Sequence, residues 1–244
     1  MSTAIIVQAR MTSTRLPGKV LKQVQGKSLL AYQIERLRKV KLADTIVVAT
    51  TVNATDDPIV RFCTDEDVDF HRGSEQDVLA RYMGAARKCG ASVIVRVTSD
   101  CPLIDPEVVD HVISRFARAA GRADYVSNTL LRTYPRGLDT EVFSYKVLEE
   151  AFSRASEPTE REHVTPYIYG RPERFCLLNV AQDTDLSAHR WTVDTKEDFE
   201  LIRLMLESMY PLKPDFRMRD CLELLEEHPE WVAINRDIEQ KALS

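Results

Sequence analysis

The sequence predicts an α/β fold with a mostly parallel, Rossmann-like sheet, helices on both of its faces and a partly antiparallel elaboration. Three observations support this prediction. Short runs of β-branched and apolar residues recur through the first half of the chain, segments with helical periodicity separate them, and no repeat or low-complexity stretch interrupts the pattern. Strands that alternate with helices form parallel sheets, because each crossover helix carries the chain back to the same edge.

In the first half, a serine or aspartate stands where each helix is expected to begin, and such side chains cap free backbone N–H groups. Ser74-x-x-Asp77 has the spacing of a capping box, and Asp105-Pro106 is typical of a helix start. The predicted strands are 4–9, 45–50, 68–71 and 92–97, and the predicted helices are 28–40, 57–64, 74–88 and 105–120.

The second half has a different pattern, with a polar loop around Pro135 and Gly137 and a second capping-box spacing at Thr195-x-x-Asp198. We expect one domain over 1–244, in which residues 129–183 form a lid or dimerisation elaboration and residues 199–244 form C-terminal helices. The predicted strands are 124–128, 139–144, 175–180 and 190–193, and the predicted helices are 144–155, 159–169, 195–209, 218–227 and 231–241.

The composition excludes several classes of protein. The formal net charge is −5, which lacks the basic balance of a nucleic-acid binder, and no apolar run has the roughly 18–20 residues of a membrane span. The five cysteines have wide, irregular spacing, which indicates free thiols in a reducing compartment. We therefore expect a cytoplasmic protein that binds neither nucleic acid nor membrane.

The loop after the first predicted strand concentrates charge and hydroxyl groups. Three cations, Arg10, Arg15 and Lys19, and the hydroxyl groups of residues 12–14 lie within ten residues. Guanidinium forks, an ammonium group and backbone N–H groups are the donors that a triphosphate needs. The loop is not a Walker motif, since Ser13 and Val20 replace its first glycine and its final hydroxyl residue. A solvated basic loop is the alternative interpretation.

The same loop carries a specific resemblance. The run QARMTSTRLPGKVL resembles the signature of the cytidylyltransferases that make CMP-activated acid sugars, which include CMP-Kdo synthetases and acylneuraminate cytidylyltransferases. It is most similar to the branch typified by spore coat polysaccharide biosynthesis protein F. The resemblance implies a sheet of the nucleotide-diphospho-sugar transferase type and a loop that binds the triphosphate of CTP. The matching residues are Ala9, Arg10, Ser13, Arg15, Leu16, Pro17 and Lys19.

Two aspartates are candidate ligands of Mg²⁺, the expected cofactor. Asp100 follows a predicted buried strand in VTSDCPLID, and Mg²⁺ prefers one or two carboxylates together with phosphate oxygens. The resemblance implies that Asp194, in WTVDTKED, completes the metal site. It also implies catalytic roles for Arg10, Lys19 and Asp100. A turn or cap is the alternative role of each aspartate.

A third segment, HRGSEQDVLARY, resembles the turn that the family places near cytosine and ribose. The resemblance implies that Gly73, Ser74 and Asp77 belong to the nucleotide site. Helix capping alone explains Ser74 and Asp77 equally well, and the two roles can coexist because a helix N-terminus is also a polar binding site.

The second substrate is expected to meet two further segments, RGLDTEV and EREHV. Their resemblance to the same branch implies acceptor contacts for Arg136, Asp139, Glu141 and His163, and structural roles are the alternative. The five histidines have no zinc-ligand spacing.

These observations predict transfer of CMP from CTP to a sugar, an acidic keto sugar by resemblance, with release of pyrophosphate for surface polysaccharide synthesis. The resemblance also implies a homodimer. Three other functions stay open: a glycosyltransferase that uses a preformed nucleotide sugar, a sugar-1-phosphate nucleotidyltransferase, and a non-catalytic nucleotide-binding protein. The loop of cations counts against the first, and its single glycine, Gly18, counts against the second.

Overall fold

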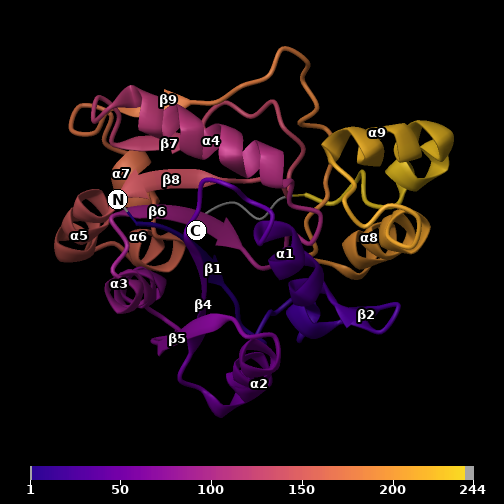
Figure 1. The fold of residues 1–244 in the computed structure, drawn as a ribbon, viewed down its shortest axis with the longest axis horizontal. Helices are drawn as coiled ribbons and strands as arrows, with labels where there is room; N and C mark the ends of the chain where they lie inside the picture. The colour runs from indigo at the N-terminus through magenta and orange to yellow at the C-terminus, as the bar shows by residue number, and fades with distance from the viewer. Residues whose placement is uncertain (1, 240–244) are drawn as a thin grey trace.

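The computed structural model describes residues 2–239, which form helices packed around one large sheet (Figure 1). The sheet has seven strands in the order β5-β4-β1-β6-β8-β7-β9. β8 is antiparallel to both of its neighbours, whereas every other pairing is parallel. The predicted mostly parallel sheet with an antiparallel part is confirmed. The strands are β1 (Thr3–Gln8), β4 (Thr45–Thr51), β5 (Asp69–Gly73), β6 (Val93–Thr98), β7 (Tyr125–Ser127), β8 (Glu141–Ser144) and β9 (Leu177–Asn179).

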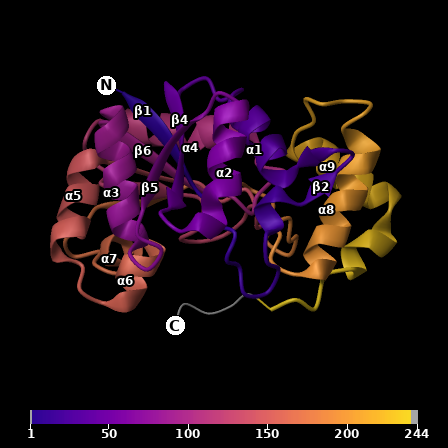
Figure 2. The same ribbon diagram turned by 90° about the horizontal axis from the view of Figure 1, so that it is seen from below.

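Helices cover both faces of the sheet, as Figure 2 shows from below. The first core cluster joins one face to α1 (Leu29–Leu37), α2 (Asp57–Asp65), α4 (Pro106–Ala119), α8 (Lys196–Met209) and α9 (Met218–Glu227). The second joins the other face to α3 (Val78–Cys89), α5 (Tyr145–Arg154) and α7 (Pro166–Tyr169), with α6 (Pro158–His163) against α3.

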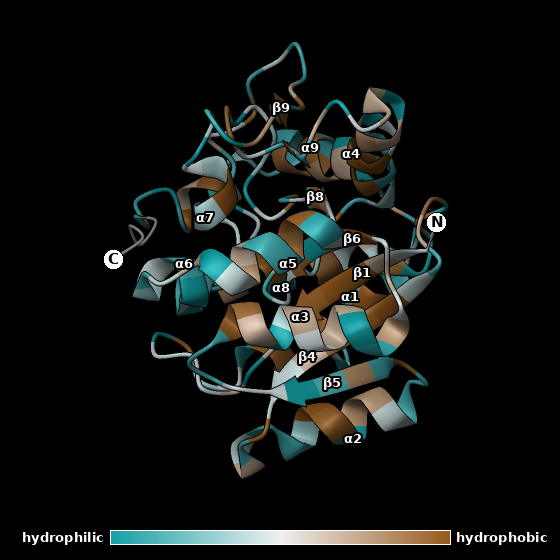
Figure 3. Ribbon diagram, turned by 90° about the vertical axis from the view of Figure 1, so that its left-hand side faces the viewer, coloured by the Kyte–Doolittle hydropathy of each residue, from teal (hydrophilic) through white to brown (hydrophobic). Residues whose placement is uncertain are grey.

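Alternation along β1 explains how one strand serves both clusters. Ile5 and Val7 are fully buried in the first cluster, and Ile6 is fully buried in the second. Successive side chains of a strand point to opposite faces, so a strand that is covered on both faces by helices is apolar on both faces over most of its length. Figure 3 shows the hydrophobic strands β1 and β6 between helices whose outer surfaces are hydrophilic.

The register brings two strand ends together. Gln8, the last residue of β1, pairs with Thr98, the last residue of β6. Because the two strands are parallel neighbours, the loops that follow them leave the sheet side by side. The cation-rich loop after β1 and the loop that carries Asp100 after β6 therefore meet at one edge.

Several predicted helix starts are confirmed. Ser28 caps α1 by accepting from the backbone N–H of Ala31, and Asp105 caps α4. Thr195 and Asp198 form the predicted capping box of α8. Three small elements have no counterpart in the prediction: two 3-10 helices (Lys19–Leu21 and Ala54–Asp56) and the hairpin of β2 (Gln23–Val24) and β3 (Lys27–Ser28).

The structure corrects the predicted start of α3. The helix begins at Val78, and its N-cap is Asp77, which accepts from the N–H of Ala80. Ser74 instead accepts from the N–H of Asp77 at 3.0 Å. Ser74 and Asp77 therefore do not form a capping box. Ser74 closes a turn directly after β5, which extends to Gly73, and Asp77 alone caps the helix.

Three other predicted elements are wrong. The helix expected over 159–169 is broken into α6 and α7, where Val164 takes a φ of 73° before Pro166. Residues 190–193 form only an isolated bridge between Arg190 and Arg136. A 3-10 helix (Pro229–Ala233) is the last helix within residues 2–239, and the end of the helix expected over 231–241 lies outside them.

Polar contacts with α1 and α4, as well as the core, attach the C-terminal helices to the rest of the fold. Asp105 accepts from the N–H of Met218 at 2.6 Å, and the buried guanidinium of Arg36 donates to the carbonyl of Phe216 at 2.9 Å. Among the described residues, no helix combines the length and the apolar composition required to cross a membrane.

Gly137 provides a test of how the loop after β7 packs. Its φ is 106°, and a Cβ there would lie 2.6 Å from the backbone carbonyl of Trp191. Gly121 also has a positive φ, of 80°, but a Cβ there would meet nothing within 4 Å. We expect Gly121→Ala to lower the free energy of unfolding by about 1–3 kcal/mol through backbone strain alone. Gly137→Ala should cost about 1–3 kcal/mol more because of the overlap. Urea denaturation measures both, and equal losses would contradict this packing.

Candidate active site

A cavity of about 410 Å³ lies at the carboxyl ends of β1 and β6. Six cations and four carboxylates line it, which gives it a positive formal balance in a chain of net charge −5. It brings together residues predicted for three different roles. The predicted residues in its lining are Ala9, Arg10, Ser13, Arg15, Lys19, Asp100, Arg136, Asp139, His163 and Asp194.

Backbone contacts fix the cation-rich loop over this cavity. The N–H of Met11 donates to the fully buried carboxylate of Asp56 at 2.7 Å, and the N–H of Gly18 donates to the carbonyl of Met11 at 2.9 Å. Gly18 has a φ of 68°, a left-handed conformation that glycine adopts without strain. The loop closes on itself there, and Lys19 enters the 3-10 helix with its side chain directed to the cavity.

Lys19 is the central cation of the site. Its Nζ donates to Asp100 Oδ2 at 3.1 Å, to Asp194 Oδ1 at 2.8 Å and to the carbonyl of Val193 at 2.7 Å. Burial would lower the pKa of Lys19, but the two carboxylates outweigh it and raise that pKa above its ordinary value. Burial likewise opposes the charge of Asp100, yet Lys19 lowers the pKa of Asp100 to about 2. Both groups are therefore charged throughout the neutral range.

The remaining oxygens of the two aspartates also have donors. Asp194 Oδ2 pairs with Arg15 at 2.8 Å and with Arg190 at 3.0 Å. Asp100 Oδ1 accepts from the hydroxyl of Thr98 at 2.6 Å. The charge of the aspartate pair is thus fully compensated by the protein's own cations.

The donor set at this point fits Mg²⁺. Two carboxylates and a backbone carbonyl converge on one cation, the ammonium group of Lys19, so the pocket they form already holds a positive charge. Mg²⁺ takes oxygen ligands and often uses only one or two carboxylates, with substrate phosphates completing its shell. Asp100 and Asp194 are the residues that would hold it. Within residues 2–239, no group of three or more His, Cys, Asp or Glu residues is placed to hold a metal alone.

The lining of the cavity also contains three of the four predicted acceptor residues, Arg136, Asp139 and His163. The carboxylate of Asp139 accepts hydrogen bonds from both terminal nitrogens of Arg132, at 2.5 and 2.8 Å, and this bidentate ion pair fixes its position. Within residues 2–239, Arg136 forms no salt bridge with a carboxylate, and burial together with Arg132 lowers its pKa. His163 reaches the cavity from the end of α6, beside Glu162.

Four predicted site residues lie elsewhere in the described chain. Gly73, Ser74 and Asp77 are absent from the cavity lining, and Asp77 pairs with Arg161 while it caps α3. A Cβ at Gly73 would lie 3.2–3.3 Å from Arg81, so this glycine makes room for a side chain of the protein. The carboxylate of Glu141 is buried and accepts from Arg96, Tyr125 and Thr165. None of the four lines the cavity, and their contacts with substrate stay predictions.

Two arginines of the cavity escaped the sequence analysis. Arg81, on α3, is 2% exposed and donates to the carbonyl of Ser74 at 2.8 Å. Burial lowers its pKa, and neighbouring Arg10 adds to that effect. Arg96 lies on β6 and pairs with Glu141. A charged residue inside the apolar run 92–97 was the available signal for Arg96, whereas Arg81 is an ordinary polar position of a helix pattern.

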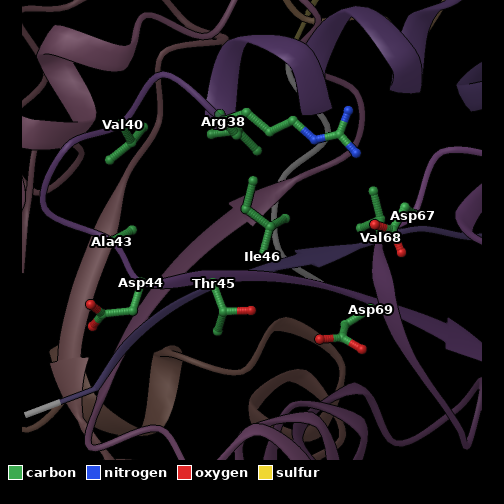
Figure 4. A pocket seen from close by; sticks show the side chains of 10 residues that line it. Arg38, Val40, Ala43, Asp44, Thr45, Ile46, Asp67, Val68 and Asp69 are labelled. Carbon is green, nitrogen blue, oxygen red and sulfur yellow. The ribbon is translucent and has the colours of Figure 1, made fainter.

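A second cavity, of about 270 Å³, lies where β4 and β5 begin, at the opposite edge of the sheet (Figure 4). Its carboxylates are Asp44, directly before β4, Asp67, shortly before β5, and Asp69, at the start of β5, and Arg38 pairs with Glu66. It has no set of side chains that converge on one point, and the edge with the cation-rich loop is the candidate active site.

Comparison with known proteins agrees with this geometry. A sequence model described as cytidylyltransferase matches residues 4–228. An uncharacterised protein of Methanocaldococcus jannaschii is 38% identical over 97% of this chain and 96% of its own length. The spore coat polysaccharide biosynthesis protein SpsF of Bacillus subtilis is 34% identical over 92% of this chain and 94% of its own length.

Solved structures give the same assignment. A cytidylyltransferase from Leptospira borgpetersenii is 33% identical, with a TM-score of 0.91 over 99% of this chain and 100% of that one. A CMP:2-keto-3-deoxy-manno-octonic acid synthetase, solved with CTP, shares the fold at 20% identity, with a TM-score of 0.63 over 86% of this chain and 100% of that one. With a family match over nearly the whole sequence and a site of cations and paired carboxylates, this chain belongs to the cytidylyltransferase family.

Proposed function

We propose that this protein transfers CMP from CTP to an acidic keto sugar and releases pyrophosphate, as a step in surface polysaccharide synthesis. One observation carries the proposal: Lys19 holds Asp100 and Asp194 at one point, while Arg10, Ser13 and Arg15 of the same loop line the same cavity. This places donors for a triphosphate directly beside a pair of carboxylates suited to Mg²⁺. The synthetase solved with CTP and the relative named for spore coat polysaccharide synthesis support the choice of substrates.

In the proposed reaction, a sugar hydroxyl attacks the α-phosphorus of CTP. The bond from that phosphorus to the bridging oxygen of the β-phosphate breaks, and pyrophosphate leaves. Arg10, Ser13, Arg15 and Lys19 bind the phosphates and stabilise the charge on the departing group. Mg²⁺ between Asp100 and Asp194 would supply further positive charge at the α-phosphate. Positioning and charge stabilisation account for the rate, without a covalent enzyme intermediate.

The acceptor would lie against Arg136, Asp139 and His163. Arg136 lines the cavity and has no carboxylate partner in the part of the chain that the structure describes, and an acid sugar brings the carboxylate that such a guanidinium needs. Arg81, another cavity-lining arginine without an ion pair in the described chain, adds to the positive field that attracts both substrates. The homodimer, the lid role of residues 129–183 and the cytoplasmic location stay predictions.

The first prediction concerns the donor nucleotide. In the presence of Mg²⁺, we expect CTP to bind more tightly than UTP, ATP or GTP. Arg15→Ala and Lys19→Ala should each weaken CTP binding about 10–100-fold, because each removes a charged hydrogen bond to phosphate. Lys22→Ala, a cation just outside the cavity, is the matched control and should bind normally. Isothermal calorimetry measures the affinity of the wild type for the four nucleotides and the affinity of each variant for CTP. Tighter binding of a finished nucleotide sugar than of CTP would favour a glycosyltransferase instead.

The second prediction follows from the position of Lys19. Because its ammonium group occupies the point on which both aspartates converge, we expect Lys19→Met to bind Mn²⁺ more tightly than the wild type when no nucleotide is present. An increase of about 10-fold in Mn²⁺ affinity would correspond to about 1.4 kcal/mol, the free energy by which the ammonium group of Lys19 opposes cation binding in the wild type. Direct titration with Mn²⁺ gives the affinities. A loss of Mn²⁺ binding in Lys19→Met would show that the lysine supports the cation site rather than filling it.

The third prediction concerns the acceptor. Arg136→Met should raise the KM of an acidic keto sugar about 10–100-fold, since it removes a charge-assisted contact to the sugar carboxylate. The KM of CTP serves as the internal control and should change little. Steady-state measurement of pyrophosphate release provides both constants. Equal increases in the two KM values would place Arg136 with the nucleotide.

A further inference from the structure

The segment that follows α9 reaches the site through one buried amide. Asn235 is 4% exposed, and its Nδ2 donates to the carbonyl of Arg190 at 2.9 Å and to Asp198 Oδ1 at 2.9 Å. Asn235 does not line the cavity, and it lies beyond residue 228, where the family match ends. Any effect that it has on the reaction must therefore pass through its two partners.

Both partners determine where Asp194 lies. Asp198 is fully buried, and its Oδ2 accepts from the backbone N–H groups of Asp194 at 2.9 Å and Thr195 at 3.0 Å. Arg190 donates to Asp194 Oδ2 at 3.0 Å, and it also donates to both oxygens of Asp198, at 2.8 and 3.0 Å. Asp198 thus holds the backbone of Asp194, and Arg190 holds its carboxylate.

The amide of Asn235 completes this network. It joins the backbone carbonyl of Arg190 to the carboxylate of Asp198, so both residues of the Arg190–Asp198 ion pair are also bonded to Asn235. Buried polar networks are rigid when every member is satisfied, and they become the weak point of a site when one donor is lost. Burial opposes the charge of Asp198, and the donors Arg190 and Asn235 are among the groups that lower its pKa below the ordinary value.

We propose that Asn235 is a positioning residue for Asp194, and that the C-terminal segment thereby sets the affinity of the site for a divalent cation. The proposal rests on the proposed function, in which Asp194 is a metal ligand. Partners of this kind, which hold a metal ligand from behind, typically change metal affinity by about 10–100-fold when they are removed. The alternative is that Asn235 only attaches the C-terminal segment to the core.

A comparison of two probes separates these roles. Calorimetry would measure the affinity of the full-length protein for the Mn²⁺–CTP complex and for metal-free CTP in the presence of EDTA. For Asn235→Ala, we expect an affinity about 10-fold lower for Mn²⁺–CTP and an unchanged affinity for metal-free CTP. Asn235→Asp, which has the same size but brings a second carboxylate to Asp198, should show the same split.

Leu225→Ala is the matched control. Leu225 is a buried residue of α9 without a polar contact to the network, so its truncation should lower the Tm while the ratio of the two affinities stays that of the wild type. The inference is overturned if both Asn235 variants keep the wild-type ratio, or if Leu225→Ala shifts the ratio equally. If the wild type binds metal-free CTP and Mn²⁺–CTP equally well, the proposed metal role of Asp194 fails and this inference fails with it. If it binds neither, the proposed function itself fails.

Discussion

The ammonium group of Lys19 lies between the carboxylates of Asp100 and Asp194, and the geometry of the cavity depends on this contact. Lys19 follows the first strand, Asp100 follows the central strand β6, and Asp194 precedes α8, so one buried charge joins three distant parts of the sequence. A buried cation is costly without partners, and buried carboxylates are equally costly. Each group therefore requires the others, and the loops that carry them must fold together.

The sheet makes this contact possible by its register. Gln8 and Thr98 end neighbouring parallel strands at the same level, which places the loop with Lys19 beside the loop with Asp100. The third participant, Asp194, arrives through backbone pairing, since the N–H of Val193 donates to the carbonyl of Asp100 at 2.8 Å. Segment 189–194 also pairs with Arg136 on its other side, through contacts of 2.7 and 3.0 Å. A short stretch without regular structure thus connects the loop of Asp100 with Arg136, on another side of the cavity.

Most charges of the cavity are paired within the described structure. Protein cations pair with Asp100 and Asp194, and protein carboxylates pair with most of the cations. In the proposed function, substrate binding would be an exchange of partners, in which phosphates would pair with Lys19 and Arg15 and leave the carboxylates for a metal. Such an exchange keeps charges paired at each stage, which a buried site needs. Arg81 and Arg136 have no ion pair within the described chain, and they give the cavity its attraction for anions before any exchange begins.

The sequence by itself determined the local features. Apolar runs predicted the strands, because a strand buried on both faces is apolar over most of its length, and Ser28, Asp105 and Thr195 marked helix starts because capping is a short-range interaction. The composition of residues 10–19, with three cations and three hydroxyl groups, also indicated a phosphate-binding loop. Only the tertiary structure decided that Glu141 and Asp77 serve other partners, that residues 190–193 form no strand, and that Arg81, Arg96, Arg190 and Asn235 belong to the site or its support. Those assignments depend on contacts between residues far apart in the chain, and no local pattern records which buried donor will meet which buried acceptor.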